Sequence, residues 1–131
     1  MPLKRWSFAL LLSAVPFTAS ADAALECGVG GGNQVEIGEC LAQVEANADT
    51  ALKAVLDLSV EAAERLDEVT GRPAAVPALN AGQAAWSAYR DAHCEFVGAT
   101  FGGGSGTGIA IRSCRIEAAR ERAAELGQYT Q

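Results

Sequence analysis

The chain has few of the residue types on which most catalytic and metal sites depend. It contains one histidine, His93, and its four cysteines include no Cys-x-x-Cys pair of the kind that binds zinc. No lysine is followed by serine or threonine, so the sequence has no phosphate-binding P-loop. No serine or acid lies at a spacing that indicates a catalytic triad. We therefore expect a protein that is not an enzyme and holds no cofactor or metal.

The sequence is also poor in strand-forming patterns and in positive charge. No run of alternating valine, isoleucine and threonine is long enough for a sheet, which favours an all-α fold. The 10 basic residues are outnumbered by 16 acidic ones, and the formal net charge is −6. This balance argues against nucleic acid as a partner. Such an acidic excess can steer a protein toward a basic partner, but a solvated surface is the better interpretation of it.

The first 21 residues have the organisation of a secretory signal. Lys4 and Arg5 precede an apolar stretch, residues 6–15, and the small residues 19–21 form a cleavage site before Asp22. The stretch is too short to cross a membrane, which takes about 20 apolar residues, and no other segment qualifies. Cleavage would leave eight basic residues against sixteen acidic ones. We expect a signal peptide at residues 1–21 and a periplasmic or secreted domain at residues 22–131 that has no membrane span.

Three helices are predicted in the mature domain. The first begins near Asn33, which forms a capping box with Glu36, and its apolar residues recur at helical spacing as far as Val69. Gly71 and Pro73 end this helix, which spans roughly 50 Å at 1.5 Å per residue. The fold should be a small disulfide-stapled helical hairpin or three-helix bundle with one long first helix. The other predicted segments are an irregular start at 22–32, a connector at 73–77, a second helix at 78–97, a glycine-rich loop at 98–108 and a third helix at 109–126.

Four cysteines in an exported chain predict two disulfides, which can be connected in three ways. An up-down-up arrangement would bring the start of the first helix, the end of the second and the start of the third to the same end of the bundle. On this geometry we favour Cys27 with Cys94 and Cys40 with Cys114. The spacing of the cysteines does not by itself decide among the three connectivities.

The predicted second helix carries an aromatic face. We expect this face to be packed, with His93 in a packed or capping role rather than as a base. An arginine on such a face needs a partner, so Arg90 should form an internal ion pair with an acid of the first helix or with a helix C-terminus. Asp91 and Glu95 point away from the face, whose members are Trp86, Tyr89, Arg90, His93, Phe96 and Val97.

Two other features have a functional and a structural interpretation. Asp57 and Glu61 lie one helical turn apart, as a glycosidase pair could, but solvation and salt bridges with Lys53 or Arg65 explain them better. The glycine-rich loop could cradle an anion at the start of the third helix. A flexible connector is the better interpretation, and any function of the loop would be as a mobile contact surface.

The stretch from Gln83 to Cys94 reads Gln-x-x-Trp-x-x-Tyr-Arg-Asp-x-x-Cys, and a Gly/Ser loop and a further cysteine follow it. This pattern resembles the lysozyme inhibitor LprI-like N-terminal domain family of small secreted helical domains, and the likeness extends from Cys27 to Leu126. Upstream, Cys40 and the run from Ala48 to Leu52 also fit, whereas Lys53, Leu56 and Ala119 replace residues that are usual in the family. The matching positions are Gln83, Trp86, Tyr89, Arg90, Asp91, Cys94, Gly102, Gly103, Gly104, Ser105, Gly106, Cys114, Arg120, Arg122 and Leu126.

The resemblance implies a periplasmic or secreted lysozyme inhibitor that blocks a glycosidase cleft and performs no chemistry of its own. Its partner would be lysozyme or another basic cell-wall-active protein, because opposite charge speeds encounter. The motif residues are expected to be mainly structural, and the loop at residues 102–106 is the candidate contact surface. The alternative is a structural or protein-interaction module of the cell envelope.

Overall fold

The computed structural model describes residues 22–131, and the predicted signal peptide lies outside the described residues. Within this range the chain consists of helices and short connections, without a strand, which confirms the all-α prediction. The elements are, in order, α1 (Ala23–Gly28), α2 (Gln34–Thr70), α3 (Ala75–Ala99), α4 (Thr107–Leu126) and the 3₁₀ turn η1 (Gly127–Tyr129).

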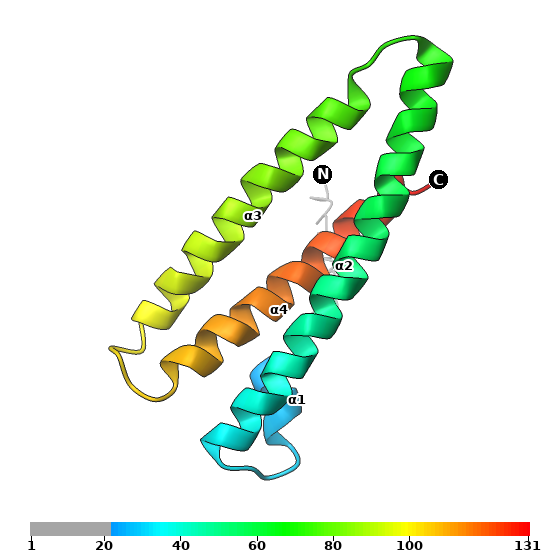
Figure 1. The fold of residues 1–131 in the computed structure, drawn as a ribbon. Helices are drawn as coiled ribbons and strands as arrows, with labels where there is room; N and C mark the ends of the chain where they lie inside the picture. The colour runs from blue at the N-terminus through cyan, green and yellow to red at the C-terminus, as the bar shows by residue number, and fades with distance from the viewer. Residues whose placement is uncertain (1–21) are drawn as a thin grey trace, which may run out of the picture.

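Helices α2 and α3 form a long antiparallel hairpin, and α4 packs back against both of them (Figure 1). With 37 residues α2 is about 55 Å long, whereas the 20 residues of α4 span about 30 Å. Helix α4 therefore covers only the half of the hairpin that lies nearer the α3–α4 loop. Figure 1 shows the α2–α3 connection reaching well beyond α4, while α1 lies beside the start of α2 at the other end.

The long helix α2 begins and ends where the sequence predicts. Oδ1 of Asn33 accepts hydrogen bonds from the N–H groups of Val35 and Glu36 at 2.9 and 3.2 Å, and the Glu36 carboxylate accepts the Asn33 N–H at 3.2 Å. This is the predicted capping box. At the other end Gly71 has φ 64° and ψ 21°, the left-handed conformation that glycine adopts without the steric cost of a side chain.

Helix α3 begins at Ala75, earlier than the predicted start at residue 78. The cause is Asp67 in the last turn of α2, whose carboxylate accepts the N–H groups of residues 74, 75 and 76 at 3.1, 2.8 and 3.1 Å. These bonds, chiefly the one from Ala75, hold the pKa of Asp67 below its ordinary value. Pro77 fits the first turn of α3. The N–H groups of a first turn have no carbonyl partner within the helix, so the N–H that proline lacks is not missed there.

The segment 22–32, predicted to be irregular, contains the short helix α1, which corrects that prediction. Asp22 caps it, since Oδ1 accepts the Ala24 N–H at 3.0 Å and also the hydroxyl of Ser113 on α4. Helix α1 packs against both α2 and α4. The hydrogen bond to a distant helix explains why periodicity within so short a segment could not reveal it.

Two small clusters of buried residues lie where α4 meets its neighbours. The first joins α1, α2 and α4, and the second joins α2 to α4 and has Trp86 of α3 packed against it. Because α4 takes part in both clusters, it holds the other helices together. The buried members are Ala23, Leu41 and Ile116 in the first cluster, and Leu52, Ala119 and Leu126 in the second.

The two disulfides join Cys27 to Cys40 and Cys94 to Cys114, so the predicted pairing of Cys27 with Cys94 and Cys40 with Cys114 is wrong. The helix ends do meet at one end of the bundle as expected (Figure 1). At that end, however, α1 turns back on α2, which brings the Cα atoms of Cys27 and Cys40 to 5.8 Å. Cys94 faces Cys114 directly across the α3–α4 loop, with Cα atoms 5.5 Å apart.

Peptide mapping without reduction would test this connectivity. Trypsin would leave the first two cysteines in one peptide and would place Cys94 and Cys114 in two others, residues 91–112 and 113–115. We expect these two peptides to be recovered as a linked pair, separate from the first. A single species that contains all three peptides would show instead that Cys27 and Cys40 are bonded to Cys94 and Cys114.

A pair of glycine substitutions would test the close packing of α3 on α4. A Cβ at Gly98 would lie 2.7 Å from Cδ1 of Ile111, whereas a Cβ at Gly82 would meet open space. Gly98→Ala should lower the free energy of unfolding by about 1 to 3 kcal/mol through overpacking. Gly82→Ala should raise it by roughly 0.5 to 1 kcal/mol, because alanine favours the helix. If both substitutions change the free energy of unfolding equally in urea denaturation, the close packing of α3 on α4 at Gly98 is contradicted.

Candidate interaction surface

Arg90 forms the ion pair expected of it. Its side chain is 16% exposed, and Nη1 lies 2.7 Å from Oδ1 of Asp49 on α2. Nε of Arg90 is 3.7 Å from Oδ1 of Asp91, and its guanidinium carbon is 5.1 Å from the ring centre of Trp86. Arg90 thus ties α3 to α2.

Arg122 makes the corresponding connection from α4 to α3. Its Nε donates to Oε1 of Gln83 at 3.0 Å, and its guanidinium carbon is 6.0 Å from the ring centre of Trp86. Nη1 of Arg122 also lies 2.8 Å from Oε2 of Glu125 one turn away. Trp86 is therefore in contact distance of two guanidinium groups, from α3 and α4, which is a favourable cation–π arrangement.

Arg120 fastens α1 to α4. Its Nη1 and Nη2 lie 2.8 and 2.9 Å from the two oxygens of Glu26, and Nη1 is 3.2 Å from Oε1 of Glu117. The hydrogen bonds from Arg120 hold the pKa of Glu26 below its ordinary value, and the bond to Glu26 raises the pKa of Arg120. Oε1 of Glu117 also accepts the Ala23 N–H at 3.1 Å.

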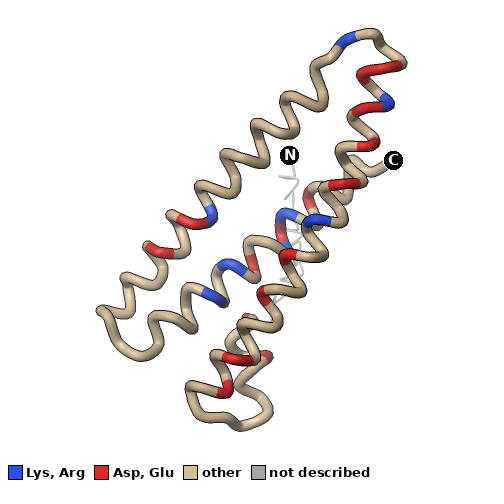
Figure 2. The backbone as a smooth tube through the Cα atoms, viewed as in Figure 1, with Lys and Arg blue, Asp and Glu red and all other residues tan. Residues whose placement is uncertain are grey.

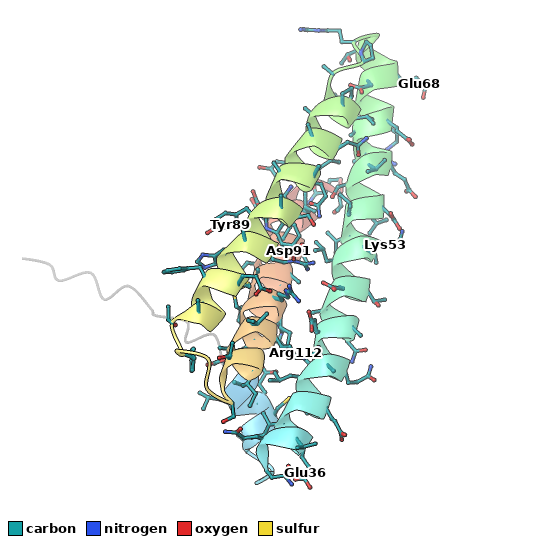
Figure 3. All side chains as sticks on the ribbon, turned by 60° about the vertical axis from the view of Figure 1, so that its left-hand side comes forward. Glu36, Lys53, Glu68, Tyr89, Asp91 and Arg112 are labelled. Atoms are coloured by element: carbon teal, nitrogen blue, oxygen red, sulfur yellow. A yellow bond between two sulfur atoms is a disulfide. The ribbon has the colours of Figure 1, made fainter. Side chains whose placement is uncertain are left out.

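The aromatic face of α3 is not packed throughout, which corrects the sequence prediction. Tyr89 and Phe96 are 62% and 65% exposed, and His93 between them is exposed as well. The rings of Tyr89 and His93 stack at 5.3 Å with an interplanar angle of 11°, and the His93 and Phe96 ring centres are 6.4 Å apart. Figure 3 shows Tyr89 on the side of α3 that faces away from α2. Helices α2 and α4 cover only part of this face, so Tyr89, His93 and Phe96 remain exposed to solvent.

We call the exposed row of Tyr89, His93 and Phe96 the aromatic ladder. A groove runs between Tyr89 and His93 of this ladder and α4. It has a volume of about 310 Å³, and α3 lines it with Trp86, Tyr89 and His93. A second hollow of about 410 Å³ shares Cys114 with the first and continues toward Phe101 and the start of α1. We call the first hollow the aromatic–acidic groove. Its lining from α4 consists of Cys114, Glu117, Ala118, Glu121, Arg122 and Glu125.

Three carboxylates give the α4 wall of the groove its charge. Glu117, Glu121 and Glu125 follow at intervals of four residues, which places them along one side of the helix. Glu117 and Glu125 are paired with arginines of α4, whereas Glu121 forms no ion pair within residues 22–131. The four-residue spacing could be read from the sequence. The position of these acids opposite Tyr89 and His93 could not be predicted from the sequence, because it depends on how α4 is rotated against α3.

The glycine-rich loop forms a tight connection between α3 and α4. Gly102 and Gly103 have φ values of 66° and 79°, which few other residues adopt. Phe101 precedes them and is 55% exposed at the edge of the second hollow. The contact role predicted for residues 102–106 remains a prediction, and the exposed Phe101 beside them adds apolar surface at this end.

Comparison with known proteins gives the family. The family model described as "Lysozyme inhibitor LprI" matches residues 27–126. The chain belongs to the lysozyme inhibitor LprI family. The matched range extends from the first cysteine to the end of α4, so all four helices except the start of α1 fall within the family domain. The family is one of inhibitors, which agrees with a protein that acts by binding.

A curated relative supports the family match without adding a function. The chain is 33% identical over 99 residues to "Uncharacterized protein R02472" of Rhizobium meliloti (strain 1021), and the alignment covers 72% of this chain and 71% of that protein. No solved structure gives a significant match. Among the helices of residues 22–131, none has the length and apolar character to span a membrane.

The Arg120–Glu26 pair should make the docking of α1 depend on pH. A carboxylate with a lowered pKa stabilises the fold above its ordinary pKa, and this contribution is lost as the pH falls through the folded-state value. Arg120→Gln should therefore lower the melting temperature at pH 7, and the difference from the parent should shrink on acidification. Arg65→Gln, which alters an arginine of α2 outside every ion pair of residues 22–131, is the control. A difference that persists at low pH would contradict the assigned cause.

Proposed function

We propose that this protein inhibits lysozyme by binding it outside the cytoplasm, without chemistry of its own. The observation that carries the proposal is the match of residues 27–126 to the lysozyme inhibitor family. The two disulfides support an extracytoplasmic location, because such bonds persist in oxidising compartments. The parts of the proposal that go beyond the family are the target and the binding mode.

The distribution of charge supports a basic target. Figure 2 shows acidic positions along α2 and basic positions gathered on α4. Five arginines of the described chain and Lys53 are bound to carboxylates of the chain itself: Arg90, Arg112, Arg115, Arg120 and Arg122.

The remaining excess of carboxylates faces solvent. Glu61, Glu64 and Glu68 on the outer side of α2 are exposed and take part in no ion pair of residues 22–131. Residues 22–131 contain 16 acidic and eight basic side chains. An outward field of this sign accelerates encounter with a basic protein and weakens as salt is added.

The proposal is tested by adding the oxidised domain, residues 22–131, to a cell-wall lysis assay with a basic c-type lysozyme at low and moderate salt. Inhibition should rise with dose, approach completion near equimolar amounts at concentrations above Kd, and weaken severalfold at the higher salt. A c-type, a g-type and an i-type enzyme should be compared. No inhibition of any class at a large molar excess would overturn the proposal, and retention of the protein on insoluble peptidoglycan alone would favour an envelope interaction module.

A further inference from the structure

We infer that the aromatic–acidic groove is the surface that receives the partner, and that it takes an arginine or lysine side chain from a basic protein. The inference rests on the proposed function only in naming lysozyme as the protein that presents this side chain. It assigns the contact to α3 and α4 rather than to the glycine-rich loop or to the acidic side of α2.

The first argument is the exposure of the aromatic ladder. Tyr89 and Phe96 leave more than 60% of their surface in water, and the other exposed residues of α3 are small or polar apart from Pro77. The inner side of α3 already packs on α4 through Trp86, so the ladder is not needed to close the core. Exposed aromatic side chains are the residues that most often dominate binding energy at protein interfaces.

The second argument is the charge that faces the ladder. Glu121 has no ion pair in the described chain and lines the same groove as Tyr89 and His93. A guanidinium or ammonium group placed there would meet a free carboxylate on one side and aromatic faces on the other. Such a site combines a charge-assisted hydrogen bond with a cation–π contact, and the two reinforce each other in a partly desolvated groove.

The third argument is rigidity. Cys114 lines the groove, and its disulfide to Cys94 joins the two helices that form the walls. Trp86 at the floor is held by Arg90 and Arg122 through the contacts described above. A preformed site loses little conformational entropy when it binds, which favours affinity.

Other surfaces fit a partner less well. A groove of about 680 Å³ lies between the far halves of α2 and α3 and the C-terminal segment, which adds Gln128, Tyr129 and Gln131. Alanine and leucine form most of the rest of its lining, and no charged side chain is present to select an occupant. The outer side of α2 has carboxylates but no aromatic residues. A cell-wall fragment that bears carboxylates is disfavoured at the aromatic–acidic groove, because the unpaired Glu121 would repel it.

Charge-matched variants separate local contact from general attraction. Glu121→Lys changes the groove, and Glu64→Lys makes the same change of charge on α2, away from it. Tyr89→Ala removes the exposed ring that stacks on His93 beside the groove. With a basic c-type lysozyme as the probe, we expect Glu121→Lys and Tyr89→Ala each to raise Kd by about tenfold or more, and Glu64→Lys to raise it by less than about threefold. Far-ultraviolet circular dichroism and the melting temperature would confirm that each variant is folded.

The outcomes distinguish this inference from the proposed function. If the parent protein inhibits lysozyme and Glu121→Lys and Glu64→Lys weaken binding equally, the inhibitor proposal stands and the groove assignment is overturned. If the parent does not bind lysozyme, the groove is tested with a nona-arginine peptide, with nona-glutamate as the control. Trp86, the only tryptophan after residue 21, should then change its fluorescence with nona-arginine, and Glu121→Lys but not Glu64→Lys should abolish the change. Equal responses of the two variants, or a response to peptidoglycan fragments instead, would overturn the inference.

Discussion

The packing of α4 against both long helices is the interaction on which the rest of the structure depends. Helix α4 contributes to both buried clusters, and its arginines bind carboxylates or an amide on α1, α2 and α3. Without α4, Leu41 and Leu52 of α2 would lose Ile116, Ala119 and Leu126, the residues of α4 with which they are buried. The short chain thus obtains its stability from one helix that contacts every other.

This arrangement also determines the surface. Because the arginines that join the helices are bound to carboxylates, the exposed charged side chains that remain unpaired are mostly acidic. Helix α4 is shorter than α2 and α3 and packs against only one side of α3. It therefore leaves part of the aromatic face of α3 exposed beside its own glutamates. The same packing that builds the core therefore creates the groove to which we assign binding.

The disulfides reinforce the end of the bundle at which the groove begins, at Cys114. Each closes a short loop, with cysteines separated by 13 and 20 positions, and loops of this size stabilise a fold by about 3 kcal/mol in the chain-entropy model. Neither crosses from the N-terminal pair of helices to the α3–α4 pair. Contacts of Arg120, Asp22 and the buried residues make that connection instead, so non-covalent packing holds the two halves together.

The sequence was enough to predict the three long helices, the capping box at Asn33, the glycine stop at Gly71 and the need of Arg90 for a partner, because each depends on residues a few positions apart. Motif residues could also identify the family. The cysteine pairing, the start of helix α1, the start of α3 at the Asp67 carboxylate and the exposure of the aromatic residues became visible only in the packed fold. These features depend on how one helix is rotated and positioned against another. They are set by contacts between residues 7 to more than 90 positions apart in the chain, which helical periodicity does not encode.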